Sequence, residues 1–273
     1  MTVSDVETSA FKLIGVLYLP PMPGAGNYSG MPIPEIADRA VHDAQALLDA
    51  GFDAALLQNA TDVPEQSQVP IETVAAMAAI GAAVRGRCDI PLGVCVAHND
   101  GVAAIAVSYA IGATFVRVKV LTGAAVGPGG LTEACAAQTA SLRNRLPGHI
   151  SVFADVHEVT SVSLAFQDPA LEARQHVRFG GADGVIFTSD SGASDALAVI
   201  AELKAVLGPT VPVLIGGRVT EENIGAVRRG ADGAIVATSI RTGSEISGRV
   251  DSVKATRLAR GVGRRATVVG VRQ

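Results

Sequence analysis

The sequence predicts a (β/α)₈ barrel that takes up nearly the whole chain of 273 residues. Short apolar runs alternate with helical patterns along the chain, which is typical of a parallel sheet covered by helices. Such a barrel needs roughly 250 residues. A weak internal repeat, which a barrel assembled from double βα units would leave, adds support. In this repeat a glycine closes a helix and opens every second strand, and we expect a left-handed helix cap at Gly51, Gly112, Gly181 and Gly230.

The alternative fold is an open, doubly wound sheet, which is also built from alternating strands and helices. That fold commonly carries a Gly-x-Gly-x-x-Gly turn after its first strand. No such turn follows the first apolar run here. The barrel is therefore favoured.

Prolines delimit the first βα unit. Residues 12–19 form an apolar run, and Pro20-Pro-Met-Pro-Gly-Ala-Gly then prevents further pairing, because proline cannot donate to a β-ladder. This loop would lie at the catalytic end of the barrel, where it is either a lid or binding loop or a rigid connector. Pro34 then starts a helix that keeps helical spacing to Ala50.

The later strands are apolar on both faces, as parallel strands buried under helices must be. They are predicted at residues 52–59, 91–96, 114–120, 150–157 and 185–188, and within 211–217 and 230–241. The helices are predicted at residues 71–85, 102–110, 131–146, 169–179, 194–207 and 251–260, with a short one after Asn223. One barrel domain therefore covers residues 1–273, with residues 1–10 and 262–273 as loose termini.

Composition indicates a large core and excludes several classes of partner. Hydrophobic residues make up 48% and charged residues 18%, and tryptophan is absent, so Ala, Val, Ile and Leu must supply the packing. The net charge is −4 and Lys or Arg runs are missing, so neither nucleic acid nor a membrane is an expected partner. Three cysteines without metal-type spacing, and no signal segment, indicate a cytoplasmic protein. Association of the chain into a homo-oligomer is compatible with this composition.

The ends of the last two strands carry small residues that predict a phosphate site. In (β/α)₈ barrels the loops after strands seven and eight often bind phosphate through backbone N–H groups. We expect Gly216, Gly217, Thr238 and Ser239 to form this site, with Arg218 or Arg241 as further candidates.

Arg117 and Lys119 lie two residues apart on the fourth strand and so share a face. Three interpretations stay open. Lys119 would form an imine if burial disfavoured its charged form. Both cations would instead bind a substrate phosphate or carboxylate, or pair structurally with Asp53 or Asp155, since buried charges are usually paired.

Asp155 and His157 repeat this spacing on the fifth strand. They would act as base and orienting residue, ligate a divalent cation, or form a structural pair. Apart from that cation, no cofactor is implied by the sequence.

Other polar residues end the second, third and sixth strands. Gln58 and Asn59 would hydrogen-bond substrate hydroxyls. Cys95 is either a core residue or a nucleophile with His98 as its base. Asn99 and Asp100 follow His98 and would bind substrate or cap the next helix. The last group, which would bind ribose-type hydroxyls or cap a helix, is Thr188, Ser189 and Asp190.

With the strand ends in place, the chain resembles the BtpA/SgcQ family. The matching motifs run in order along nearly the whole chain: Leu19-Pro-Pro-Met-Pro-Gly, Val69-Pro-Ile-Glu-Thr-Val-Ala-Ala-Met, His98-Asn-Asp, Phe115-Val-Arg-Val-Lys-Val-Leu-Thr-Gly-Ala, Ala154-Asp-Val-His and Ala237-Thr-Ser. The resemblance implies a phosphate-binding-type barrel. It also implies two kinds of function, because the cyanobacterial founder is linked to photosystem I biogenesis and other bacterial members resemble enzymes.

The chain departs from the family pattern at several strand ends. Tyr18 stands where the family has His, Gln58 where it has Glu, Cys95 and Lys119 where it has Asn, and Val159-Thr160 where a Lys and a His are frequent. Because barrel chemistry takes place at strand ends, these departures predict a retained scaffold with a different substrate.

These observations predict a cytosolic barrel enzyme that acts on a small phosphorylated metabolite, a sugar phosphate or a nucleotide. Its reaction would be of the lyase, isomerase or glycosyl-bond type, with Lys119, Asp155 and His157 as the reacting groups. The alternative is a non-enzymatic assembly or regulatory factor, as the founder of the family suggests.

Overall fold

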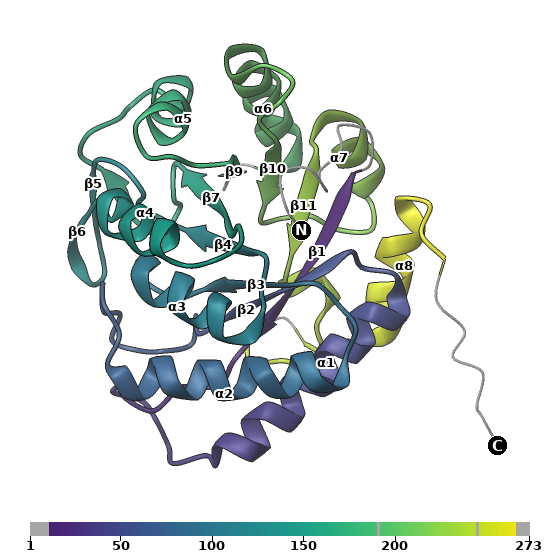
Figure 1. Cartoon of the computed structure of the whole chain (residues 1–273). Helices are drawn as coiled ribbons and strands as arrows, with labels where there is room; N and C mark the ends of the chain where they lie inside the picture. Colours follow the sequence, from purple (N-terminus) through teal and green to yellow (C-terminus); the bar gives the residue numbers. More distant parts are fainter. Residues whose placement is uncertain (1–10, 190–191, 244–245, 266–273) are drawn as a thin grey trace.

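The computed structural model describes residues 11–189, 192–243 and 246–265. Eight parallel strands close into a barrel in the order β1-β11-β10-β9-β7-β4-β3-β2, and helices surround them (Figure 1). The predicted (β/α)₈ fold is confirmed. The barrel strands are β1 (Lys12–Tyr18), β2 (Ala54–Gln58), β3 (Leu92–Cys95), β4 (Phe115–Val118), β7 (Ser151–Val156), β9 (Gly184–Thr188), β10 (Val213–Gly216) and β11 (Gly233–Val236).

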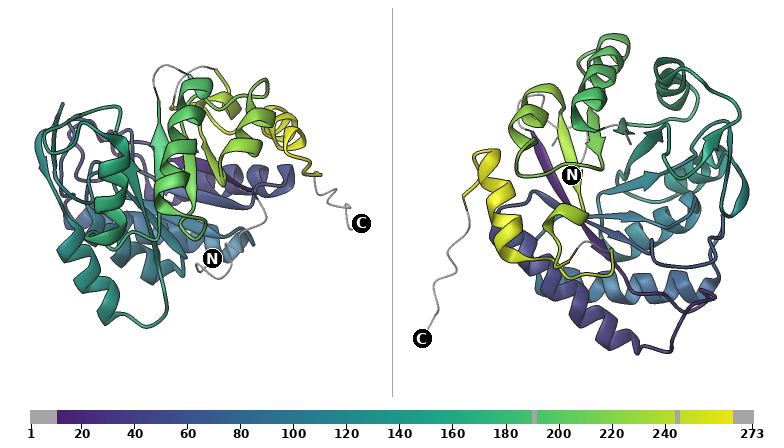
Figure 2. Two further views of the ribbon diagram at one scale, coloured as in Figure 1. Left: turned by 90° about the horizontal axis from the view of Figure 1, so that it is seen from above. Right: turned by 180° about the vertical axis from the view of Figure 1, so that it is seen from behind.

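The outer layer consists of helices that follow the barrel strands. They are α1 (Ile33–Ala50), α2 (Ile71–Arg87), α3 (Gly101–Ile111), α4 (Ala136–Arg145), α5 (Pro169–Arg178), α6 (Ala193–Leu207), α7 (Ile224–Gly230) and α8 (Ser252–Gly261). The last helix, α8, packs against the first, α1, so the outer ring closes as the barrel does (Figure 2). Among the described helices, none is long and apolar enough to cross a bilayer.

Three of the four repeat glycines adopt the expected left-handed backbone. Gly51, Gly112 and Gly181 have φ of 89°, 68° and 68°. The prediction is wrong for Gly230, which is the last residue of α7. The chain leaves that helix through Ala231 in extended backbone, which any residue adopts, so no left-handed glycine is required there.

The core has two parts, as a closed barrel requires. One lies between the strands and the helices, and the other fills the barrel with inward-facing residues that include Ile14, Leu56, Phe115 and Phe153. The rings of Phe115 and Phe153 meet edge to face with their centroids 6.0 Å apart. Gly93 makes room for them, because a Cβ at this position would lie 2.2 Å from the Phe115 ring.

A small second sheet, absent from the sequence prediction, lies in the loops that follow β4 and β7. Its strands are β5 (Ala124–Gly127), β6 (Gly130–Glu133) and β8 (Val162–Ser163), in the order β6-β5-β8. The helix predicted at residues 131–146 is therefore wrong at its start. Gly130, with φ of 91°, reverses the chain so that Leu131 pairs with Val126, and α4 begins only at Ala136.

The chain after α8 is attached to the start of the barrel. Val262 is buried, and the Arg264 guanidinium donates to the Asp53 carboxylate at 2.7 Å and to the Phe11 carbonyl at 3.0 Å. Asp53 therefore lies at the end of the barrel away from the strand tips that carry the candidate site. Residues 1–10 and 266–273, and Asp190, lie outside the described residues.

Candidate functional site

A cavity of about 380 Å³ opens at the carboxyl ends of the barrel strands, on the side of β4, β7 and β9. The small sheet covers it, because Ala124 and Ala125 of β5 and Val162 and Ser163 of β8 line it. We call it the β7 cavity. Its polar lining includes Lys119, His157, Glu158, Glu172 and Thr188. Three of these five residues were predicted from the sequence as site residues.

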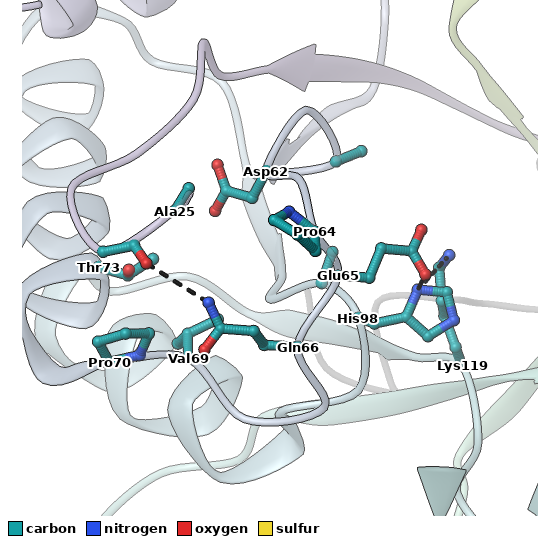
Figure 3. Close-up of a pocket in the computed structure, with 13 residues that line it drawn as sticks. Ala25, Asp62, Pro64, Glu65, Gln66, Val69, Pro70, Thr73, His98 and Lys119 are labelled. Carbon is teal, nitrogen blue, oxygen red and sulfur yellow. Dashed lines mark hydrogen bonds and ion pairs between the residues drawn. The ribbon is translucent and has the colours of Figure 1, made fainter. Parts of the chain in front are cut away.

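Lys119 lies in a cluster of buried charged groups between the β7 cavity and a smaller one. Its Nζ atom lies 3.2 Å from Glu158 Oε1 and 3.5 Å from His98 Nδ1. Glu65 reaches the same imidazole, with Oε2 3.0 Å from His98 Nδ1. Glu65, His98 and Lys119 gather at one end of the smaller cavity, with Pro70 and Thr73 at the other (Figure 3).

Charge and burial fix the protonation states in this cluster. Burial alone would raise the pKa of Glu158, but the Lys119 charge and hydrogen bonds from Thr160 and Lys119 lower it. Burial, together with the Lys119 charge, lowers the pKa of His98. At neutral pH, Glu158 is therefore a carboxylate beside the Lys119 amine, and His98 is a neutral imidazole.

Two asparagines hold the loops that carry this cluster. The Asn59 amide accepts from Ala97 N at 2.7 Å and donates to Ala97 O at 3.3 Å. The Asn99 amide binds Val120 in the same two-way manner, at 2.8 and 2.9 Å. Both side chains, expected to bind substrate, are thus engaged by backbone. Asp100 caps α3 through Ala103 N at 2.9 Å, so the capping interpretation is confirmed for this residue.

Arg117 and Asp155 form a two-pronged ion pair inside the barrel. Arg117 Nε and Nη2 donate to the two Asp155 oxygens at 2.9 and 2.7 Å, and Asp155 is 2% exposed. Burial alone would lower the pKa of Arg117, but the Asp155 charge and hydrogen bonds raise it. The pairing expected as one alternative is present for Arg117, whereas Lys119 pairs with Glu158 and not with Asp53 or Asp155.

His157 pairs with Glu172 rather than with Asp155. Its Nδ1 lies 2.7 Å from Glu172 Oε2, and the same oxygen accepts from the His157 backbone N–H at 3.0 Å. The other Glu172 oxygen lies 3.6 Å from Nε2 of the fully buried His176, which also contacts the Asp155 carbonyl at 2.9 Å. The base and orienting residue proposed for Asp155 and His157 are therefore not brought together, because the Asp155 carboxylate is occupied by Arg117.

The His157–Glu172 contact changes the pKa of both groups. The hydrogen bond to Glu172 raises the pKa of His157. Burial alone would raise the pKa of Glu172, but hydrogen bonds from His157 and His176 lower it to about 2. Glu172 is thus a carboxylate that orients an imidazole at the wall of the β7 cavity.

The predicted phosphate residues lie at the ends of two neighbouring strands, β10 and β11, beside Thr188 at the end of β9. Gly216 pairs with Thr188 of β9 and with Ile235 of β11, and η1 (Thr238–Ile240) follows β11. Gly217 has φ of 71° and is exposed. A Cβ at Gly216 would lie 2.5 Å from Thr188 Oγ1, so glycine here leaves space beside that hydroxyl. Thr188 Oγ1 and Ser239 Oγ are buried without a hydrogen-bond partner.

The two arginines near this site differ in what they contact. Arg218 is exposed beside Gly217. Arg241 is fully buried: its Nη2 donates to Val16 O at 2.6 Å, and its guanidinium lies 4.7 Å above the Tyr18 ring. Arg241 is therefore engaged by β1 and is not available to the glycine turn.

The remaining predicted residues face the barrel interior. Burial raises the pKa of Tyr18 and raises that of Cys95 to about 11, so the Cys95 thiol is protonated at neutral pH. This favours the core interpretation of Cys95. Gln58 is buried with Oε1 unpaired. Among the described residues, no group of three His, Cys, Asp or Glu side chains is arranged to hold a metal ion.

Sequence reasoning missed four residues of the site: Glu65, Glu158, Glu172 and His176. Glu158 directly follows the Asp-Val-His motif at the end of β7, and that position alone could have marked it. Glu65 and Glu172 come from a loop and from the first turn of α5, so only the fold brings them to the strand ends.

A family model described as the BtpA family matches residues 10–264. A Pyrococcus horikoshii protein, described as uncharacterized, is 40% identical over 91% of this chain and 94% of its own length. The photosystem I biogenesis protein BtpA of Synechocystis is 30% identical over 89% of this chain and 84% of its own. The putative sgc region protein SgcQ of Escherichia coli is 26% identical over 92% of this chain and 94% of its own.

Solved structures show the same barrel at low sequence identity. Tryptophan synthase from M. tuberculosis has a TM-score of 0.59 at 16% identity and covers 95% of this chain and 98% of its own. KGPDC from Streptococcus mutans has a TM-score of 0.59 at 9% identity, covering 93% and 98%. N-(5'-phosphoribosyl)anthranilate isomerase from Pyrococcus furiosus has a TM-score of 0.55 at 12% identity, also covering 93% and 98%. These likenesses establish the fold.

Proposed function

This chain belongs to the BtpA family, and from that premise and the geometry of its strand ends we propose that it is a cytosolic enzyme acting on a small phosphorylated metabolite. The substrate class is a sugar phosphate or a nucleotide. The reaction belongs to the lyase, isomerase or glycosyl-bond type. One structural neighbour is named N-(5'-phosphoribosyl)anthranilate isomerase, and this name includes a phosphorylated sugar. The same kind of barrel is therefore used by a protein named for a substrate of the proposed class.

The observation that carries the proposal is the pair of unpartnered hydroxyls at the ends of β9 and β11. Thr188 Oγ1 and Ser239 Oγ are buried without a partner. A buried hydroxyl without a hydrogen bond costs about 1–3 kcal/mol, so each requires an explanation. The exposed turn at Gly217 directly follows β10, the strand that lies between β9 and β11. A phosphate accepting from both hydroxyls and from the N–H groups of this turn would satisfy them.

His157 supplies the group best placed for proton transfer. Its imidazole and Thr188 line the same cavity, and Glu172 fixes the ring through Nδ1. A histidine with a carboxylate on one ring nitrogen is a typical acid–base arrangement. Glu172 would act as the positioning residue for His157, a role that the sequence offered only within the Asp155–His157 pair, as one of three alternatives.

Lys119 would act as a cation and not as an imine-forming amine. Its Nζ contacts the Glu158 carboxylate at 3.2 Å, so the ion pair engages the amine that imine formation needs as a free nucleophile. Lys119 lines the β7 cavity beside Glu158, so it can stabilise negative charge that develops on a bound substrate.

Thermal unfolding with matched ligands tests the proposal. Ribose 5-phosphate, glucose 6-phosphate and AMP are compared with ribose, glucose and adenosine. Ligand near 100 times Kd stabilises a native protein by about 2.7 kcal/mol, which should raise the Tm by roughly 5 °C. We expect at least one phosphorylated compound, but not its unphosphorylated counterpart, to produce this shift. No shift from any phosphate would favour the assembly-factor alternative.

Variants locate the binding site. Thr188→Val and Ser239→Ala should abolish the shift while leaving the free protein as stable or more stable, because each removes an unpaired buried hydroxyl. Gly217→Val should also abolish it, since its side chain would meet Thr188. Gly208→Val is the control, because Gly208 has a similar φ of 77° with no atom near its Cβ position. An undiminished shift in Thr188→Val and Gly217→Val would place the anion site elsewhere.

A further inference from the structure

A second cavity, of about 450 Å³, lies on the other side of the barrel mouth. Its walls come from β1, the loop after β1, α1, the loop after β2 and residues 246–249. We call it the α1 cavity. In the closed ring of strands, β1 lies four positions from β7, so the α1 and β7 cavities face each other across the mouth. None of the residues assigned above to phosphate binding lines the α1 cavity.

Most of the wall is apolar. Pro20 and Pro21 line it from the loop after β1. Ile36 lines it from the first turn of α1, and Met31 from the residues just before that helix. Val63 and Ile246 also line the cavity while 54% and 39% exposed. Large apolar side chains exposed around a concave surface of this volume are typical of sites for small molecules with an apolar body.

Charged groups at the cavity leave an excess of positive charge. Asp43, 4% exposed, accepts from Arg249 Nε at 2.8 Å and lies 4.0 Å from Arg241 Nη1. Two guanidinium groups thus share one buried carboxylate, and His42 approaches the same carboxylate at 3.8 Å. Arg39 adds a third guanidinium, whose partner Glu35 lies on the solvent side with both side chains about half exposed. A planar guanidinium is well suited to a carboxylate, sulfonate or phosphate group.

We propose that the α1 cavity is a second binding site, which takes a small organic anion with a flat or aliphatic apolar body. The apolar wall would hold the body, and the half-exposed Arg39 guanidinium would hold the anionic group. Arg249 would add only its Nη1 group, because its Nε donates to Asp43 and its Nη2 donates to the Arg39 carbonyl. This site goes beyond the proposed function and does not depend on it. The Tyr18 ring lies in the wall of the cavity and also against the barrel interior, so an occupant would lie directly beside the barrel mouth.

Methyl NMR on protein labelled at methionine with ¹³C locates the site without any enzymatic assay. Met31 lines the α1 cavity, whereas Met77 lies on the buried face of α2 and serves as the internal control. The probe is 8-anilinonaphthalene-1-sulfonate, an aryl sulfonate, and the matched neutral probe is N-phenyl-1-naphthylamine. We expect saturable 1:1 binding of the sulfonate that shifts the Met31 methyl signal and leaves that of Met77 in place. Affinity for the neutral probe should be about threefold to fivefold weaker, which is the upper part of what an exposed ion pair supplies.

Two variants and one control decide the result. Arg39→Gln should weaken the sulfonate about threefold and leave the neutral probe unchanged. Arg85→Gln, an equally exposed arginine on α2, should change neither. Met31→Trp should weaken both probes by narrowing the cavity. A Met31 signal that does not move, or equal affinity for both probes, would overturn the proposal. Because no phosphate or turnover is involved, either outcome is independent of the phosphate site.

Discussion

Glu172 accepts two hydrogen bonds from His157, one from the backbone N–H at 3.0 Å and one from Nδ1 at 2.7 Å. His157 has a left-handed backbone with φ of 54°, which costs a residue other than glycine about 1–2 kcal/mol. A single carboxylate from the first turn of α5 thus holds both the backbone and the ring of a residue at the end of β7. Such strain next to a cavity is typical of functional sites.

Replacing Glu172 with glutamine should lower both the pKa of His157 and the stability of the fold. The carboxylate that stabilises the imidazolium is lost, and a hydrogen bond to a charged group contributes about 1.5–3 kcal/mol. Histidine ring NMR titration measures the first effect, and urea unfolding measures the second. Glu202→Gln, at an exposed position on α6, is the control. An unchanged His157 pKa in Glu172→Gln would mean that the contact does not govern this histidine.

The contribution of Glu172 should also depend on pH in a defined direction. Its pKa falls from an ordinary 4.5 to about 2 in the folded protein, so the carboxylate favours the folded state above pH 4.5. That stabilisation is lost as pH falls from about 4.5 through about 2. We therefore expect the stability difference between the native protein and Glu172→Gln to be full at pH 6 and to shrink steadily below pH 4.5. A difference that grows on acidification would contradict this sign.

Arg117 and Asp155 should behave as one structural unit. Removing either partner leaves an unpaired buried charge, so Arg117→Met and Asp155→Leu should each cost about 3–5 kcal/mol. The double variant Arg117→Met/Asp155→Leu should recover most of this loss, because no buried charge remains. Urea unfolding of the four proteins gives the coupling energy. Additive losses in the double variant would show that the two residues act independently.

The barrel was predictable from the sequence because its strands and helices follow periods that are visible in the chain. The spacing of Arg117 and Lys119 offered a pair with Asp53 or Asp155 as one of three interpretations, and Arg117 does pair with Asp155. Which carboxylate serves which cation was not predictable. Asp155 and His157 are two residues apart, yet they have different partners, because the chain turns left-handed at His157 and directs its ring toward α5.

The small sheet that covers the β7 cavity was not predictable from the sequence for a different reason. Residues 124–133 carry weak strand signals, and β8 is only two residues long. β5 and β6 form a local hairpin in the loop after β4, and β8 forms only because the loop after β7 meets this hairpin at the mouth and pairs with it. Such long-range pairing leaves no periodic pattern in either loop.

Lys119 should resist borohydride trapping with carbonyl substrates. Its Nζ lies 3.2 Å from the Glu158 carboxylate, and this ion pair engages the amine that would have to attack a carbonyl. Sodium borohydride is added with phosphorylated aldehydes or ketones, and peptide mass spectrometry then examines the peptide containing Lys119. We expect this lysine unmodified, with exposed lysines such as Lys254 reporting nonspecific reductive labelling. A substrate-dependent adduct confined to Lys119 would restore the imine mechanism.

Cys95 should be unreactive in the folded protein. It is 1% exposed inside the barrel, and its pKa of about 11 leaves roughly one thiolate in a thousand at pH 8. Iodoacetamide at pH 8 should therefore modify it only after unfolding in urea, with the half-buried Cys135 as an internal comparison. Mass spectrometry of the alkylated peptides over time gives the rates. Rapid modification of Cys95 in the native protein, faster than that of Cys135, would show an activated thiolate and return Cys95 to the list of candidate nucleophiles, with the nearby His98 as the base to test next.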